Sequence, residues 1–302
     1  MPFFPTSLIQ LRDITGVAAG GTATINCPKG WRYRRIILAL QDSGVGNTNA
    51  PAVSAITSGD LQVILGSKVI RRLTGTQLDY LNTQNGSQYA SYGVAGAGNG
   101  GGITYLPIFY EEPWRKRADF QNGLACETGW LDQNGVFQIK VPIAAGTTTP
   151  VLGALAIVDG FSSGKPNPVM KMYSDDANTA SATLDLANIF QGAPASDLVE
   201  SISLFDPSDS NAQSKQVIKA RLILNGQVVL DDVTNAQMID LLKGADMNPT
   251  VGAYNIVLDH DDLFESLRSV GSISASQLTV TLAAASAGTL RRVTQRLGDP
   301  TL

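Results

Sequence analysis

The residues of this 302-residue chain that could do chemistry are few and scattered. The one histidine, His260, lies in the acidic stretch Asp259–Asp262. A metal site or an acid–base site built on it would need a second His or a nearby Cys to complete the set, and the sequence supplies neither. We therefore expect His260 to be an exposed loop residue.

The carboxylates do not form a recognisable catalytic or metal-binding set either. Glu111 and Glu112 are adjacent, and on a strand they would point to opposite faces, which makes a poor general acid–base pair. Asp206, Asp209 and Asn211 offer oxygen ligands for calcium, but their spacing lacks the EF-hand pattern, so a solvated loop is expected.

Known nucleotide-binding and hydrolase motifs are also absent from the sequence. It contains no nucleophile elbow, Walker loop or dinucleotide-binding fingerprint. The Gly98–Gly102 cluster neither follows a predicted strand nor opens a helix, so it does not form a phosphate cradle. We predict that the chain is not an enzyme and carries no cofactor, with a structural calcium ion as the open alternative.

Composition narrows the classes of protein further. Charged residues make up 16% of the chain, below the usual quarter, and the formal net charge is −4. Direct binding of nucleic acid would need a basic face, so it is not expected. The two cysteines, Cys27 and Cys126, are too few for a disulfide framework and are predicted to be buried free thiols.

No segment is predicted to direct the chain to or through a membrane. The start, Met1-Pro2-Phe3-Phe4-Pro5, lacks a basic region before its apolar residues, and no apolar run is long enough to span a bilayer. We expect a soluble protein that assembles in a cytoplasm.

Short β-rich segments separated by turn signals dominate the chain. Val136–Val141 alternates, whereas the nearly continuous apolar run Val151–Val158 predicts a strand buried on both faces. Pro107 lies in a strand-like run and is expected at an edge or a bulge, and Tyr89–Gly102 is predicted to be a glycine-rich surface loop. Further predicted strands are Arg34–Leu40, Leu61–Leu65, Lys68–Ile70, Thr104–Tyr110, Leu198–Phe205, Val217–Leu224, Gln227–Leu230, Tyr254–Leu258 and Leu278–Ala283. Many short strands at regular spacing are typical of a sandwich or jelly roll.

An internal repeat divides the chain into two similar halves. At an offset of 160 residues, Val63–Asn82 aligns with Ile223–Leu242 without a gap. Both copies predict a hairpin with a glycine turn and then a helix capped by Thr74 or Thr234. A duplicated β-domain explains the match better than chance reuse of a hairpin. With Gly160–Pro168 as linker, the predicted domains are residues 1–160 and residues 161–302.

Segments in both halves resemble one known family, the double jelly-roll major capsid proteins of tailless icosahedral phages that enclose a membrane, of the corticovirus and tectivirus type. The resemblance covers nearly the whole chain. It is carried by Ile14–Gly20, Pro28–Tyr33, the Gly66 hairpin with Leu73–Leu78, Leu106–Phe109 before Glu112–Arg115, Leu224–Gly226, Asp240–Lys243, Tyr254–Leu258 and Asp262–Leu267.

The resemblance implies an all-β fold of two tandem eight-stranded jelly rolls with short helices in the loops. It also implies a structural major capsid protein whose pseudo-hexagonal homotrimers tile an icosahedral shell over an internal membrane. The expected partners are then neighbouring copies, penton and minor capsid proteins, and peripherally the viral membrane. The expected location is the virion capsid, assembled in the host cytoplasm.

Two sets of residues are predicted to serve assembly. The repeat places Arg71 and Arg72 opposite Asp231 and Asp232, so unlike charges would alternate around a pseudo-sixfold ring and favour the correct contacts. The apolar residues Phe3, Phe4, Leu8 and Ile9 stand before the first predicted strand. We expect them to form an arm against the membrane or a neighbouring subunit.

Two other functions compete with a capsid role. A tandem β-sandwich that binds carbohydrate or a receptor, as a lectin or a spike does, would need exposed aromatic side chains, for which Tyr105, Tyr110 and Trp114 are the candidates. A cupin-like enzyme would need several metal-binding histidines, which the sequence lacks.

Overall fold

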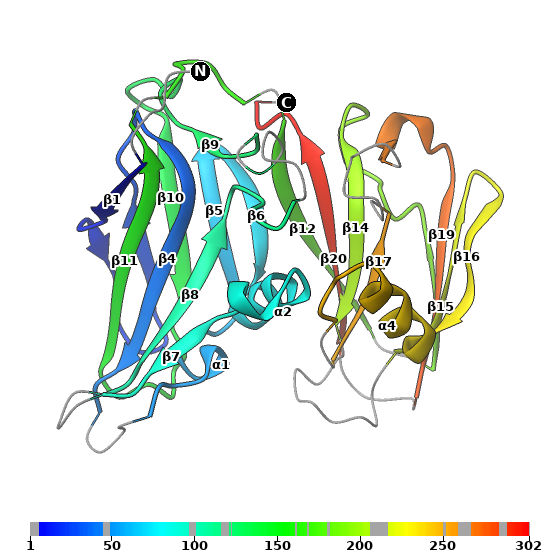
Figure 1. Ribbon diagram of the computed structural model, residues 1–302, viewed down its shortest axis with the longest axis horizontal. Coiled ribbons are helices and arrows are strands. Elements are labelled where there is room, and N and C mark those ends of the chain that lie inside the picture. Colours follow the sequence, from blue (N-terminus) through cyan, green and yellow to red (C-terminus); the bar gives the residue numbers. More distant parts are fainter. Residues whose placement is uncertain are drawn as a thin grey trace. The chain divides into compact units, whose positions relative to one another are not determined.

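The computed structural model describes two compact units, Met1–Lys171 and Met172–Pro300 (Figure 1). The residues it describes are 6–44, 49–96, 101–115, 121, 123–160, 162–167, 169–179, 182–205, 217–249, 252–258, 267–283 and 289–301. Within these residues, no helix has both the length and the apolar character needed to cross a membrane. The predicted domain boundary after residue 160 falls between the last strand of the first unit and Met170, where the next strand begins.

Unit 1 consists of two antiparallel sheets. The first has the strand order β1 (Thr6–Gln10), β11 (Pro150–Asp159), β4 (Arg32–Asp42), β8 (Ile103–Phe109) and β7 (Tyr92–Val94), with β9 (Cys126–Glu127) beside β4. The second has the order β6 (Lys68–Thr74), β5 (Asp60–Gly66), β10 (Val136–Pro142), β3 (Thr22–Asn26) and β2 (Ile14–Thr15). Helices α1 (Val53–Ile56) and α2 (Gly75–Gln84) and the turn η1 (Ser87–Tyr89) lie in its connections.

Unit 2 is built in the same way. One group of strands has the order β17 (Ala253–Val257), β14 (Leu198–Phe205), β20 (Thr289–Gly298) and β12 (Met170–Thr179), with β18 (Arg268–Ser269) beside β14. The other has the order β13 (Thr183–Ala187), β19 (Ser276–Leu282), β15 (Val217–Leu224) and β16 (Gln227–Thr234). Helix α4 (Asn235–Gly244) and the turn η3 (Val270–Ser272) complete the described part.

The two units share one topology. Without the two- and three-residue strands, each described unit has eight strands, which are divided between its two sheets in the same way. Numbered along the chain, they are ordered first-eighth-third-sixth in one sheet and second-seventh-fourth-fifth in the other. This is the jelly-roll order, so the predicted double jelly roll is confirmed.

Side-chain alternation puts the core of unit 1 between its two sheets. On β10, Phe137, Ile139 and Val141 are buried as predicted, and the Phe137 ring meets the ring of Tyr33 from β4 edge to face at 4.8 Å. The prediction that Val151–Val158 is buried on both faces is wrong, because β11 buries only alternate residues and leaves Val151 44% exposed.

Two local predictions concern strand edges. Pro107 lies on β8, beyond the point where the pairing of β8 with β7 ends. No second neighbouring strand is described at this position, so the N–H that proline lacks interrupts no ladder of hydrogen bonds. The predicted surface loop Tyr89–Gly102 is wrong in part, because Tyr92–Val94 forms β7 and pairs with Ile103–Tyr105. The ring of Tyr92 stacks on that of Tyr105 at 4.9 Å, which explains why a glycine-rich segment forms a strand.

The repeat predicted from the sequence recurs in atomic detail at the two helices. Thr74 caps α2, accepting a hydrogen bond from the backbone N–H of Gln77, whose side chain accepts one from the backbone N–H of Thr74. Thr234 and Gln237 form the same capping box at α4. Each box satisfies two backbone donors that the first helical turn leaves unpaired.

We expect Thr74→Ala and Thr234→Ala each to lower the free energy of unfolding by about 1 kcal/mol, since each removes one cap hydrogen bond. Thr74 is buried and Thr234 is partly exposed, so the first loss should be the larger. Urea titrations followed by circular dichroism would measure both. Thr→Ser at the same positions keeps the hydroxyl and should retain most of the stability.

Candidate assembly surfaces and a buried charge cluster

The four charged residues that the sequence repeat aligned have different environments in the structure. Arg71 is 1% exposed. Its guanidinium donates from Nη1 to the carbonyl oxygen of Phe109 at 2.5 Å and lies 4.6 Å from the centre of the Tyr110 ring. The predicted interface role of Arg71 is therefore wrong, because a buried side chain does not reach a neighbouring chain. The alternation of hydrophobic residues could not predict the burial of Arg71, because the buried position on β6 is occupied by a charged residue.

The other three charges remain at the surface. Arg72 donates from Nε to Asp60 Oδ2 at 2.8 Å, across the β5–β6 hairpin. Asp231 and Asp232 form exposed pairs with Arg221 and Lys219, across the β15–β16 hairpin. Exposed pairs of this kind contribute little to stability and are open to exchange, so contact between these charges and a neighbouring roll stays a prediction.

The predicted N-terminal arm is a strand from Thr6 onward. Residues Thr6–Gln10 pair antiparallel with β11, with Leu8 opposite Ile157 and Ile9 opposite Ala156. Leu8 is 66% exposed and Ile9 is half-buried. The expectation that the arm precedes the first strand is thus wrong for Leu8 and Ile9, because their backbone completes the sheet. Phe3 and Phe4 lie outside the described residues.

A cluster of buried charges that sequence reasoning missed lies beside Arg71. Glu112 follows β8 and is 1% exposed, and its carboxylate accepts a hydrogen bond from Nε of Arg115 at 2.6 Å and binds the ammonium of Lys171. The neighbouring Glu111 is also buried but binds a different cation, Arg34, at 2.6 Å. The two glutamates therefore have separate structural partners and do not face a common substrate site.

Electrostatics keep Glu112 ionised in this cluster. Burial by itself would raise the pKa of the carboxyl, but the charges of Lys171 and Arg115 and their hydrogen bonds outweigh it and hold the pKa below its usual value. The ring of Trp114 also lies 5.4 Å from the Lys171 ammonium. These ion pairs hold Glu112 and Arg115, directly after β8, in a buried position that no hydrophobic pattern marks in the sequence.

Both cysteines are buried, as predicted, and neither forms a disulfide. Burial raises the pKa of Cys27 and Cys126 above the ordinary thiol value, so the reactive thiolate is suppressed. We expect no reaction with a thiol reagent at neutral pH in the native protein and two modified thiols per chain after denaturation. Rapid labelling of the native chain would contradict this burial.

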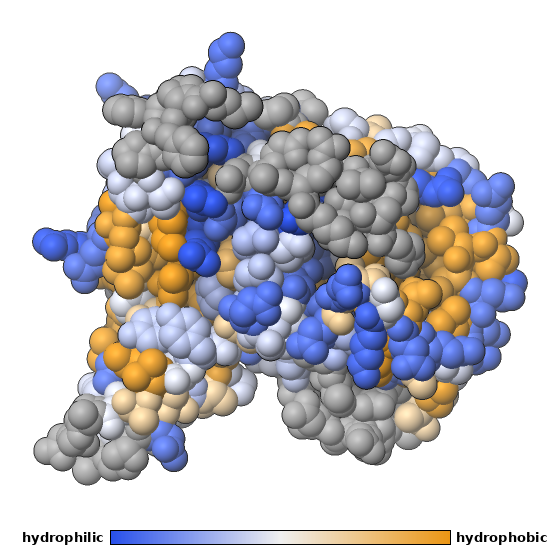
Figure 2. All heavy atoms as spheres, in the orientation of Figure 1, coloured by the Kyte–Doolittle hydropathy of each residue, from blue (hydrophilic) through white to orange (hydrophobic). Residues whose placement is uncertain are grey.

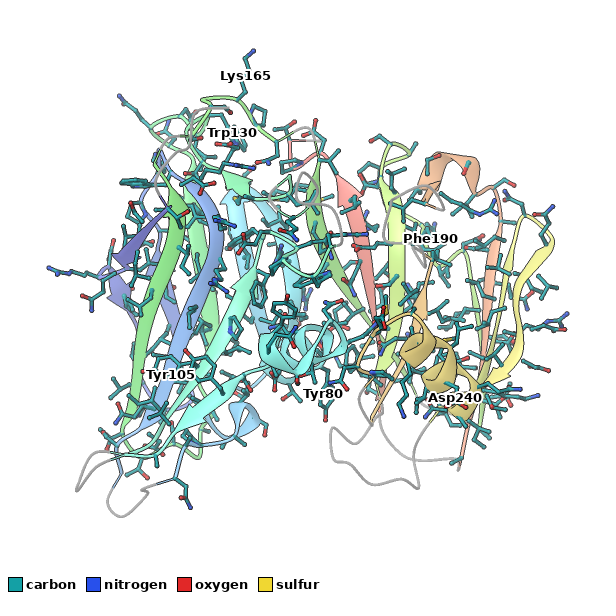
Figure 3. All side chains as sticks on the ribbon, viewed as in Figure 1. Tyr80, Tyr105, Trp130, Lys165, Phe190 and Asp240 are labelled. Carbon is teal, nitrogen blue, oxygen red and sulfur yellow. The ribbon has the colours of Figure 1, made fainter. Side chains whose placement is uncertain are left out.

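The aromatic residues proposed for carbohydrate binding do not converge. Tyr110 is fully buried, and Trp114 packs edge to face on Phe109 and Tyr89. Figure 3 shows Tyr105 and Trp130 toward opposite ends of unit 1. A cavity of about 390 Å³ near Trp130 is lined by Gly66, Ser67, Trp130, Leu131, Asp132, Asn134 and Gly135.

The structure shows no metal site in the described part of the chain. No group of three or more His, Cys, Asp or Glu residues is arranged there to hold a metal ion. His260 and the calcium candidates Asp206, Asp209 and Asn211 lie outside the described residues. The presence of calcium there stays a prediction.

Comparison with known proteins agrees with this architecture. The family model of the viral coat protein P2 N-terminal domain matches residues 8–159, which run from β1 to the end of β11 and make up half of the chain. No curated protein matches the chain in sequence.

Solved structures match the whole double roll. The major capsid protein P2 from bacteriophage PM2 superposes with a TM-score of 0.74 at 18% identity, covering 98% of both chains. VP54 of the virus PBCV-1 gives a TM-score of 0.68 at 9% identity, covering 98% of this chain and 94% of that one. The major capsid protein of Sulfolobus turreted icosahedral virus gives 0.65 at 12% identity, covering 98% and 97%. With two rolls of identical strand order and a family match that runs from β1 to the end of β11, the chain belongs to the family of the viral coat protein P2 N-terminal domain and is a viral coat protein.

Proposed function

We propose that this capsid protein assembles as homotrimers whose six jelly rolls form pseudo-hexagonal blocks, and that the blocks tile an icosahedral shell over an internal membrane. The observation that supports the proposal best is the identical strand order of the two units, first-eighth-third-sixth and second-seventh-fourth-fifth. Two similar rolls per chain let three chains present six similar units around one axis. Closed rotational symmetry then leaves no unpaired interface within a block.

The same proposal includes the partners and the place of assembly. Neighbouring blocks, penton proteins and minor capsid proteins would contact the trimers, and the viral membrane would lie beneath them. The chain would act structurally, without enzymatic activity, in virions put together in the host cytoplasm. The apolar residues Phe3 and Phe4, which precede β1, are the candidates for the inward contact.

Light scattering coupled to size-exclusion chromatography tests the trimer directly. We expect a stable species of three times the chain mass of 31.9 kDa across the micromolar range. A strict monomer over that range would exclude the block. Negative-stain microscopy of concentrated protein should then show six-lobed particles.

A further inference from the structure

We propose that β16 of one chain docks along β1 of a second copy, so that the free sheet edge of unit 2 joins the free sheet edge of unit 1 head to tail. The inference rests on the proposed trimer and specifies which two edges meet in it. Its partner is therefore another copy of this chain.

Both strands end their sheets. β1 pairs with β11 on one side, from Thr6 opposite Asp159 to Gln10 opposite Leu155. β16 pairs with β15 on one side and is the last strand of the sheet β13-β19-β15-β16. Over the residues that the structure describes, neither strand has a second neighbour, so each presents a row of backbone N–H and C=O groups that can add another strand.

Each of these edges also exposes large apolar side chains. Leu8 on β1 is 66% exposed, and Val228 and Val229 on β16 are 46% and 41% exposed. Figure 2 shows hydrophobic atoms on the β11 side of unit 1 and over the β15–β16 hairpin of unit 2. One apolar edge on each unit of the same chain is what a head-to-tail contact requires, because such a contact joins two different surfaces.

The acidic side chains of β16 and the basic side chains beside β1 are opposite in sign, although the two aspartates and Arg34 already form ion pairs within their own chain. Asp231 and Asp232 project from β16 with 74% and 54% exposed side chains. Beside β1, Arg34 donates from Nη1 to the Thr6 hydroxyl oxygen at 3.3 Å, and Arg12 is exposed two residues past the strand. Such complementarity favours encounter of unlike edges and penalises β16 against β16.

Cross-linking between differently tagged, co-expressed chains tests this pairing. One chain carries Leu8→Cys and the other Val229→Cys, and a short bismaleimide joins thiols at the shared edge. The native thiols are buried, so the unsubstituted protein supplies the background control. Val94→Cys is the matched control for Leu8→Cys, because Val94 is 50% exposed on β7 at the opposite end of the same sheet.

We expect a covalent heterodimer from the Leu8→Cys and Val229→Cys pair and none from the Val94→Cys and Val229→Cys pair. Leu8→Lys or Val229→Lys should raise the dissociation constant of the oligomer at least tenfold, whereas Val94→Lys should leave it unchanged. Circular dichroism of each variant monitors the fold.

Three outcomes would overturn the inference. Cross-links of Leu8→Cys to itself would indicate a two-fold contact instead. An oligomer that persists without any Leu8–Val229 cross-link would reject this pairing while leaving the trimer standing. A wild-type monomer would reject both.

Discussion

Replacing Glu112 with Gln is expected to lower the free energy of unfolding of unit 1 by about 3–5 kcal/mol, the range typical of breaking a buried ion pair. The substitution keeps the shape of the side chain but leaves the cations of Lys171 and Arg115 buried without the carboxylate that neutralises them. Thermal or urea unfolding monitored by tryptophan fluorescence would measure the loss, since Trp114 lies beside the cluster.

The same carboxylate predicts a pH dependence. The pKa of the Glu112 carboxyl is below its usual value in the folded state. The carboxylate therefore contributes fully to the free energy of unfolding at a pH above the ordinary glutamate pKa, and this contribution is lost as the pH falls through the lowered pKa. The difference in stability between wild type and Glu112→Gln should therefore shrink on acidification. A difference that stays constant down to strongly acidic pH would show that the pair is not ionic.

Asp60→Asn is the matched control for Glu112→Gln, because it neutralises one partner of an ion pair whose cation is exposed to water, although the Asp60 side chain itself is 15% exposed. The Arg72 side chain in that pair is 56% exposed. We expect a loss of less than about 1 kcal/mol, since water replaces the lost contact. Equal losses at Asp60 and Glu112 would contradict the account of the cluster.

Deleting residues 1–10 is expected to destabilise unit 1 by several kcal/mol, of the order of 3–5. The deletion removes β1, and with it the hydrogen bonds to β11 and the cover that Ile9 gives to the edge of the core, where a net backbone hydrogen bond contributes about 1 kcal/mol. Trimers should weaken as well, because the proposed edge is lost. Limited proteolysis and light scattering would report the two effects.

A shorter deletion separates the strand from the residues before it. Removing residues 2–5 leaves Thr6–Gln10 intact and should preserve folding and the oligomer. If that shorter deletion impairs only shell assembly, the role expected for Phe3 and Phe4 gains support. If the longer deletion leaves stability unchanged, β1 is not an integral strand of the roll.

Much of the fold followed from local sequence signals. The hairpins around Gly66 and Asn225-Gly226 form where the turn residues predicted them, with positive φ at Gly66, Asn225 and Gly226. The capped helices at Thr74 and Thr234 and the alternating β10 follow equally short-range rules. The repeat of these units was visible because the same spacing recurs 160 residues later.

Strands rich in charge were missed. β12 and β20 carry Asp175, Asp176 and several arginines, and no hydrophobic alternation marks them. In unit 2 their side chains pair across the sheet, with Arg292 donating to Asp176 at 2.5 Å and Arg291 binding Asp175. Unlike charges in register can stabilise a strand, but the register is a property of the folded sheet.

For the residues expected to mediate assembly, too, some properties followed from the sequence and others only from the tertiary structure. The amino-acid sequence alone determined that the chain carries two similar β-rolls and lacks a recognisable catalytic set, because turns, caps and alternation act over a few residues. Only the tertiary structure decided that Arg71 is buried, that Leu8 and Ile9 belong to a strand, and that Glu112 lies in a charge cluster. Those outcomes depend on strands and loops far apart along the chain, whose burial and charge pairing no local pattern contains.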